Sequence, residues 1–330
     1  MDAAPGGSAG SGDATRANRS VLDDVALRRI LVPLDGSRLA ECVAGLARSL
    51  AARFHARVIL LHVLERGAPS TVHGDRHLRG VEEAEAYLRA VQSRWRESSG
   101  VEMDWHVHPN EQGDVPGSIA DHAIDLGVDL ILLSTHGAGG TRRALFGSVA
   151  QQALRKGAHP VLLVRPPVTP GESAFAPRRI FVPLDGGGPS AALPLAGTLA
   201  RAYGAVLQLF TMVPTLSSVS GERSATALLA PAATTLSLDL EEAQAKDQLG
   251  SLVAQLRAGG LQVSGAVRRG EPAQGIVDEV QRLAPDLIVM ATHGHTGLDV
   301  VFSGSVAAAI ARKVTQPILW VRIDNNAPPR

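Results

Sequence analysis

The same pentapeptide, Val-Pro-Leu-Asp-Gly, occurs at residues 32–36 and again at residues 182–186. Thr-His-Gly at 135–137 returns at 292–294, and Gly-Ser-Val-Ala at 147–150 returns at 304–307. The separation grows only from 150 residues (32 to 182) to 157 residues (135 to 292). Solenoid repeats are about 20 to 50 residues long, whereas this period has the size of a domain. The chain is therefore predicted to contain two copies of one domain.

Each copy has the sequence pattern of an α/β domain. Short runs of Val, Ile and Leu alternate with helical segments, which is typical of a parallel sheet with helices on both faces. The expected strands lie at residues 30–34, 57–63, 103–108, 130–134 and 161–164, and at 180–184, 206–212, 263–268, 287–291 and 318–321. The expected helices of the first copy lie at residues 37–52, 81–98, 116–126 and 148–156.

The domain boundaries follow from composition. Residues 1–26 are rich in Gly, Ala, Ser and Asp and are predicted to form a disordered arm. The first domain is placed at residues 27–167 and the second at 178–325, with a linker at 168–177 that follows two prolines. Long loops are expected before the second helix of each copy, at residues 65–80 and 214–239. Loops of this length are usually mobile or functional.

The composition restricts the partners of the chain. Lys and Arg together number 32, as do Asp and Glu, and aromatic residues make up 3%. A chain without basic excess or stacking platforms is not expected to bind nucleic acid. There is no pattern of a secretory signal, and no stretch reaches the roughly 20 apolar residues of a membrane span. The protein is therefore expected to be soluble and cytoplasmic, with its single cysteine, Cys42, packed as a small buried residue.

Two glycine loops are the candidate binding elements. Each follows a strand and leads to a helix that is expected to begin at Ser148 or Ser305. Unpaired N–H groups and the positive dipole end make such a helix start a phosphate site. Alternatively, the glycines only turn the chain and the serines only cap helices, because Ser148 and Gln151 have the form of a capping box. The same loop occurring twice, with the same spacing, favours the phosphate site.

The loops resemble the signature of the universal stress protein family, G-x-x-G-x9-G-[ST]. The matching segments are Ser134-Thr-His-Gly137 with Gly147-Ser148, and Ala291-Thr-His-Gly294 with Gly304-Ser305. The first motif glycine is replaced by a small residue in both copies. The resemblance extends from about residue 28 to residue 321. It implies two tandem Rossmann-like domains of the adenine nucleotide alpha-hydrolase-like type, each with five parallel strands in the order 3-2-1-4-5.

The resemblance also implies where ATP would bind. In ATP-binding members the nucleotide lies across the carboxyl ends of strands one and four, where the strand order reverses. The implied contacts in the first copy are Val32, Pro33, Asp35, Ser37, Val63, Leu133, Gly137, Arg142, Gly147, Ser148 and Val149. Those in the second copy are Val182, Pro183, Asp185, Met212, Met290, Gly294, Gly304, Ser305 and Val306. Mg²⁺ would join such a site through the phosphates.

The two implied sites differ in charge. The first loop carries Arg142 and Arg143, which face either phosphate or solvent, whereas the second carries Asp299 and no Lys or Arg. An anionic side chain near a triphosphate repels it. The second copy also lacks a hydroxyl at the position of Ser37. The sequence therefore predicts tighter ATP binding by the first copy.

Histidines suggest a second kind of site. His106 and His108 occupy alternate positions of an expected strand, and His62, His73 and His77 extend the metal hypothesis. No Cys or Asp partner recurs at ligand spacing, so surface or core histidines are the better interpretation. The histidines of the two motif loops lack a second group at fixed spacing that would support acid–base catalysis.

Three functions stay open from the sequence. The first is a nucleotide-binding module of the stress response, read by a regulatory protein partner. The second is a slow ATP hydrolase, and the third is a scaffold in which only the first copy binds nucleotide. Pyrophosphatases of the wider group carry Ser-Gly-Gly-x-Asp-Ser after strand one, whereas this chain has Leu-Asp-Gly-Ser-Arg at residues 34–38. Dedicated catalysis is therefore not expected, and weak ATPase activity is the most that the motif allows.

The last strand of each copy is expected to join the two domains. These strands, at residues 161–164 and 318–321, are short and apolar and lie at the edge of each expected sheet. An uncovered apolar edge invites pairing with another strand. The sequence predicts an intramolecular pseudo-dimer through these strands, and a homodimer of the chain stays open.

Overall fold

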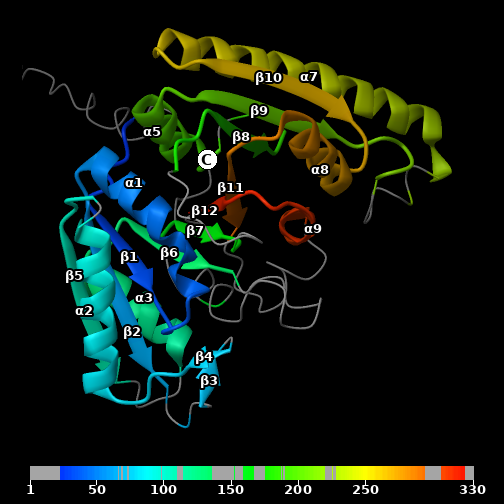
Figure 1. Ribbon diagram of the computed structural model, residues 1–330. Helices are drawn as coiled ribbons and strands as arrows, with labels where there is room; N and C mark the ends of the chain where they lie inside the picture. The colour runs from blue at the N-terminus through cyan, green and yellow to red at the C-terminus, as the bar shows by residue number, and fades with distance from the viewer. Residues whose placement is uncertain are drawn as a thin grey trace, which may run out of the picture.

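The computed structural model describes most of both halves of the chain (Figure 1). It covers residues 23–65, 67, 70–72, 74–97, 99–109, 114–135, 152, 159–166, 175–186, 188, 190–219, 225, 228–293 and 306–323. Both glycine loops lie outside these residues, as does the helix expected at 148–156 apart from Gln152. Within the described residues, no helix combines the length and the apolar character needed to cross a membrane.

The first half alternates strands and helices. Its strands in the main sheet are β1 (Arg29–Pro33), β2 (Arg57–Leu64), β5 (Met103–Pro109), β6 (Leu130–Ser134) and β7 (Val161–Val164). Its helices are the short 3₁₀ helix η1 (Ala40–Val43), α1 (Ala44–Phe54), α2 (Val81–Glu97) and α3 (Val115–Asp125). A hairpin of β3 (Thr71–Val72) and β4 (Asp75–Arg76) lies between β2 and α2.

The second half repeats this order. Its strands are β8 (Arg179–Leu184), β9 (Val206–Val213), β10 (Val263–Arg269), β11 (Leu287–His293) and β12 (Ile318–Ile323). Its helices are α5 (Leu193–Tyr203), α7 (Pro231–Ala258), α8 (Pro272–Leu283) and α9 (Val306–Lys313). The expected α/β class is confirmed in both halves.

One ten-stranded sheet runs through both halves, in the order β10-β9-β8-β11-β12-β7-β6-β1-β2-β5 (Figure 1). Counted within each half, the strand order is 3-2-1-4-5 and every pairing is parallel. The halves meet where β12 pairs with β7 in antiparallel register, with Leu319 opposite Leu162. The two last strands therefore close each other's edge, as their apolar sequences predict.

Helices cover both faces of the sheet and bury two apolar layers. One layer packs under α1, α2, α5 and α7, and the other packs under α3, α8 and α9. Central strands are buried on both faces, as in β1, where Ile30, Leu31 and Val32 are each 0% exposed. Leu162 and Leu319 belong to the first layer, and Leu163 and Trp320 to the second, so both layers continue across the seam.

Residues from the N-terminal segment also bind the second half. The backbone N–H of Val25 donates to Thr198 Oγ1 of α5 at 2.9 Å, and Arg201 of the same helix pairs with Asp24, with Nε 2.9 Å from Oδ1. The disordered arm was expected to reach residue 26, but these contacts fix residues 24 and 25 on α5. A sequence pattern of small polar residues could not show this, because the partners are more than 170 residues away.

The structure corrects two of the expected loops. The segment 214–239 was expected to be a loop, but α7 already begins at Pro231, and its Thr234 and Leu238 are buried. The segment 65–80 contains the β3–β4 hairpin, which Arg38 joins by donating its backbone N–H to Asp75 Oδ2 at 2.9 Å. Both elements lie beside the functional crevices, and they change the interpretation of those crevices.

Candidate functional site

A cavity opens at the carboxyl ends of the central strands in each half. β1 lies between β2 and β6, and β8 lies between β9 and β11. The strand order therefore reverses between β1 and β6 and between β8 and β11. In open α/β sheets such a switch point is the usual place for a ligand. The cavity of the first half has a volume of about 130 Å³, and that of the second half about 900 Å³. The two copies therefore offer crevices of very different size.

The first cavity combines apolar strand ends with four titratable side chains. Apolar walls come from β1, β2, β6 and α3, whereas Asp35, His62, Glu65 and His77 supply the polar atoms. His62 Nδ1 lies 2.7 Å from Leu34 O. Among the described residues, His62 Nε2 and His77 Nδ1 have no hydrogen-bond partner, although both side chains are buried. These two imidazoles were not predicted as nucleotide contacts, because only the folded strands bring them to the crevice.

Asp35 is held in a tight turn at the end of β1. Its Oδ1 accepts hydrogen bonds from the backbone N–H of Ser37 at 2.9 Å and from Ser37 Oγ at 2.6 Å. Ser37 Oγ in turn accepts from the N–H of Ala40 at 3.1 Å and starts the helical turn of η1. Ser37 is fully buried and does not line the cavity. The hydroxyl of Ser37 therefore shapes the turn, and its contact with a nucleotide stays a prediction.

Burial controls the titration of His62. Loss of solvation lowers the pKa of His62 from its ordinary value of 6.5. The hydrogen bond to Leu34 O opposes this shift, and nearby His77 adds to it. The folded protein therefore resists protonation at this position, whereas the unfolded chain accepts the proton near pH 6.5. Stability that is fully present above that pH must decline as the pH falls toward the lowered pKa.

We expect the His62→Gln variant to lose stability less steeply on acidification. The slope of the unfolding free energy below pH 6.5 should fall by up to about 1.4 kcal/mol per pH unit, the linkage limit for one proton. Urea denaturation at a series of pH values measures the slope, and His55→Asn, a change at an exposed position, is the control. A slope that is the same in His62→Gln and the wild type would contradict this assignment.

His77 lines the first crevice, and Leu78 packs on Gly36 beside it. His77 and Leu78 follow the β3–β4 hairpin and are both buried. Gly36 has a φ of +90°, and a Cβ at this position would lie 2.9 Å from Leu78 Cγ, so only glycine fits beneath Leu78 without strain. The matching Gly186 of the second copy has no described atom within 4 Å of such a Cβ. The hairpin segment thus fills space in the first copy that stays open in the second.

Helix α7 forms one wall of the second cavity. Glu241, Gln244 and Gln248 line it at spacings of three and four residues, which places them on one face of the helix. These residues were missed, because the expected loop ended just before them and no nucleotide motif includes them. Their spacing is the signal that could have found them. Met212 also lines this cavity. It packs directly on Gly275 of α8, where an added Cβ would lie 2.8 Å from Met212 Sδ.

The carboxylate of Asp185 stands at the end of β8 and is exposed. In the described part of the chain it has neither a hydrogen bond nor an ion pair, unlike Asp35 in its turn. Val306, the first residue of α9, also lines the cavity. The positive end of the α9 dipole therefore lies at the cavity wall, where it favours an anion.

Most predicted site residues that the structure describes line one of the two cavities. They are Pro33, Asp35, Val63 and Leu133 in the first copy, and Pro183, Asp185, Met212, Met290 and Val306 in the second. Val32 and Val182 are fully buried in the apolar layer and line neither cavity. Predicted residues outside the described part of the chain are Gly137, Arg142, Gly147, Ser148, Val149, Gly294, Gly304 and Ser305.

Fold and crevices together define a tandem doubly wound α/β protein with one crevice at the switch point of each half. The model of the universal stress protein family matches residues 26–165 and 177–322. The chain therefore belongs to the universal stress protein family, as a tandem member. The family match covers both halves separately, in agreement with the repeated motifs of the sequence.

Individual relatives share 30% or 32% sequence identity with this chain, each over less than half of its length. Universal stress protein MJ0531 of Methanocaldococcus jannaschii is 30% identical over 148 residues, which are 42% of this chain and 83% of the relative. Universal stress protein Sll1388 of Synechocystis is 32% identical over 85 residues, which are 26% of this chain and 55% of the relative. The match thus spans little more than half of the Synechocystis protein.

Two solved structures share the fold over more than nine tenths of the chain. The protein PA1789 of Pseudomonas aeruginosa PAO1, described as functionally unknown, has a TM-score of 0.64 at 18% identity and covers 91% of this chain and 94% of its own. A universal stress protein of Archaeoglobus fulgidus has a TM-score of 0.63 at 15% identity, with 93% and 100% covered. Another from Archaeoglobus fulgidus, solved in complex with dAMP, has a TM-score of 0.32 at 25% identity, with 42% and 98% covered.

Proposed function

We propose that the chain binds an adenine nucleotide at the switch points of its sheet and serves as a regulatory module of the stress response. The observation that carries this proposal is the second cavity, with a volume of about 900 Å³. Small-molecule sites have volumes of about 300 to 1,000 Å³ and combine apolar walls with few polar groups. Membership of the universal stress protein family favours an adenine nucleotide as the ligand.

The lining residues suggest how the nucleotide would lie. Met212 and Met290 offer polarisable apolar surface to the adenine ring. Asp185, whose carboxylate is exposed, would accept hydrogen bonds from the ribose hydroxyls. The phosphates would lie at the start of α9, next to Gly304 and Ser305, where the helix dipole favours negative charge. We propose ATP as the nucleotide, with Mg²⁺ bound through its phosphates.

We further propose that the second copy is the main nucleotide site of the chain. A cavity of about 130 Å³ is smaller than ordinary ligand sites, which begin at about 300 Å³. His77 and Leu78 would have to move before a nucleotide could enter the first copy. The loop charges favour the opposite order, with tighter ATP binding by the first copy. We give the difference in cavity volume precedence over the loop charges, because those charges act on a nucleotide only after it has entered the cavity.

Substitutions at the two ends of the nucleotide should have different effects. Asp185→Ala is expected to weaken ATP and AMP alike, by about tenfold to a hundredfold, because a hydrogen bond to a charged group contributes about 1.5 to 3 kcal/mol. Gly304→Val should weaken ATP more than AMP, because a side chain there obstructs the phosphate approach. Isothermal titration calorimetry of the full chain with both nucleotides measures these affinities.

Asp247→Ala is the matched control, because Asp247 is exposed on α7 and does not line the cavity. Thermal melts monitored by circular dichroism establish that the variants stay folded. If Asp185→Ala and Gly304→Val both bind ATP as tightly as the wild type, the second copy does not hold the nucleotide.

A further inference from the structure

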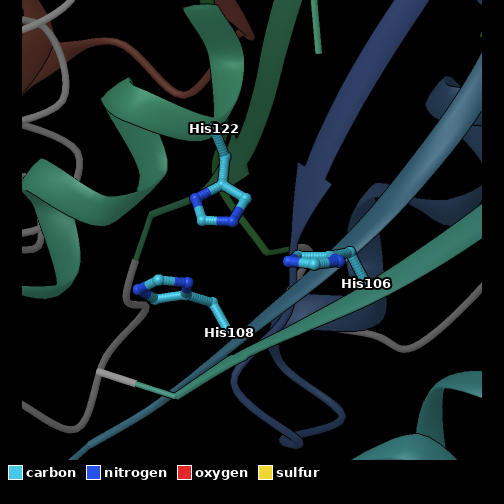
Figure 2. A group of neighbouring side chains, drawn as sticks. All are labelled: His106, His108 and His122. Carbon is cyan, nitrogen blue, oxygen red and sulfur yellow. The ribbon is translucent and has the colours of Figure 1, made fainter. Parts of the chain in front are cut away.

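Three histidines, none of which lines the first crevice, converge near the outer edge of the first half (Figure 2). His106 and His108 come from β5, the last strand of the sheet on this side, and His122 comes from α3. One nitrogen from each ring lies within 4.8 Å of the others. The sequence showed only the pair on the strand, because the third residue belongs to a helix that folds over it.

The fold explains why these rings meet. Successive side chains of a strand point to opposite faces, so residues 106 and 108 share a face and stand about 7 Å apart along the strand. Trp105 and Val107 pack into the layer under α1 and α2, which leaves His106 and His108 on the face covered by α3. His122 lies on α3, and its ring is 4.9 Å from that of His106 and 4.5 Å from that of His108, between centroids.

The nitrogens suit a metal ion. His122 Nδ1 lies 2.7 Å from Ser118 O, which fixes the ring and turns Nε2 to the other two histidines. Neutral imidazole is the form that binds Zn²⁺ and related ions.

We propose that His106, His108 and His122 form a binding site for a divalent transition-metal ion, in the first place Zn²⁺. Three histidines and an open fourth position are a common zinc arrangement, with the fourth ligand a water molecule. Zn–N bonds of about 2.0–2.1 Å in a tetrahedron separate the nitrogens by about 3.4 Å. The nitrogens need to approach by up to about 1.4 Å, which small side-chain rotations allow because His106 is exposed.

Such an ion would tie the sheet edge to the helix beside it. β5 pairs only with β2 among the described strands, so its outer edge has no strand partner there. A metal ion shared by β5 and α3 would stabilise the folded chain in proportion to its occupancy. The same helix supplies Val115 and Ile119 to the first crevice, so metal occupancy would act on an element that this crevice shares. The metal site does not depend on the proposed nucleotide function.

Titration of the metal-free full chain with Zn²⁺, without a histidine tag, tests the proposal. We expect one equivalent to bind, with an affinity that falls at least about tenfold in His106→Gln, in His108→Gln and in His122→Gln. Co²⁺ should give the intense visible absorption of a tetrahedral site in the wild type and lose it in the variants. His55→Asn, a change at an exposed histidine outside the cluster, is the matched control and should bind like the wild type.

Thermal melts supply a second measurement that does not depend on the titration. Added Zn²⁺ should raise the melting temperature of the wild type and of His55→Asn, and should leave that of His122→Gln unchanged. The proposal is overturned if the wild type binds no stoichiometric Zn²⁺. It is equally overturned if His106→Gln and His122→Gln bind Zn²⁺ as tightly as the wild type, because other histidines then hold the ion.

Discussion

Replacement of an exposed alanine at the mouth of the second cavity, Ala191→Trp, is expected to lower the ATP affinity of the full chain about a hundredfold or more. Ala191 lines the cavity and is exposed, so the larger side chain can be accommodated without disturbing the apolar layers. The indole would occupy space that the nucleotide needs. A hundredfold loss corresponds to about 2.7 kcal/mol of binding free energy.

Calorimetric titration with ATP measures this loss. The control Ala232→Trp adds the same indole to an exposed position of α7 that does not line the cavity, so it should bind ATP like the wild type. Equal ATP affinity in Ala191→Trp and Ala232→Trp, with both proteins folded, would show that the nucleotide binds elsewhere.

Removal of the side chains of His77, which lines the first crevice, and of Leu78, which packs on Gly36, is expected to create a second ATP site. His77 and Leu78 are buried over the end of β1, and Leu78 lies on Gly36. In the double variant His77→Gly and Leu78→Gly, the crevice between β1 and β6 should open to a volume like that of the second copy. The number of ATP molecules bound per chain should rise from one to two, since both copies then present an open switch point.

Native mass spectrometry at saturating ATP counts the bound nucleotides directly. Arg79→Gly is the control, because Arg79 follows in the same segment, is exposed and does not line the cavity. The wild type and the control should each bind one ATP. Two ATP molecules on the wild type, or one on the double variant when it remains folded, would contradict the role given to the hairpin segment.

The central strands were predictable from sequence because both of their faces are buried. Runs such as Val161–Val164 are apolar at every position, since helices cover both faces of the sheet. The repeated Val-Pro-Leu-Asp-Gly segments predicted both the tandem arrangement and the strand ends at which the cavities open. Local sequence was sufficient where a single element carries the signal.

Elements that depend on tertiary contacts were not predictable. The first turns of α7 contain Pro, Ala and Thr, which predicted a loop. The segment is helical because burial of Thr234 and Leu238 stabilises these turns. The β3–β4 hairpin has strands of two residues, too short to show a pattern, and the bond from Arg38 to Asp75 fixes it.

The candidate sites follow the same division. Asp185 directly follows β8 and belongs to the repeated Val-Pro-Leu-Asp-Gly segment, which located it. Gln244 and Gln248 lie on a helix whose start was misplaced, and His122 reaches the histidines of β5 only through the packing of α3. Residues whose role depends on such packing carry no local signal in one sequence.

A crystal structure of the full chain soaked with ATP is the most direct measurement of the central claim, that the second copy binds an adenine nucleotide. We expect nucleotide density in the cavity of about 900 Å³, with the ring between Met212 and Met290 and the phosphates at the start of α9. An empty second cavity at saturating ATP, or nucleotide density only at the first copy, would contradict it.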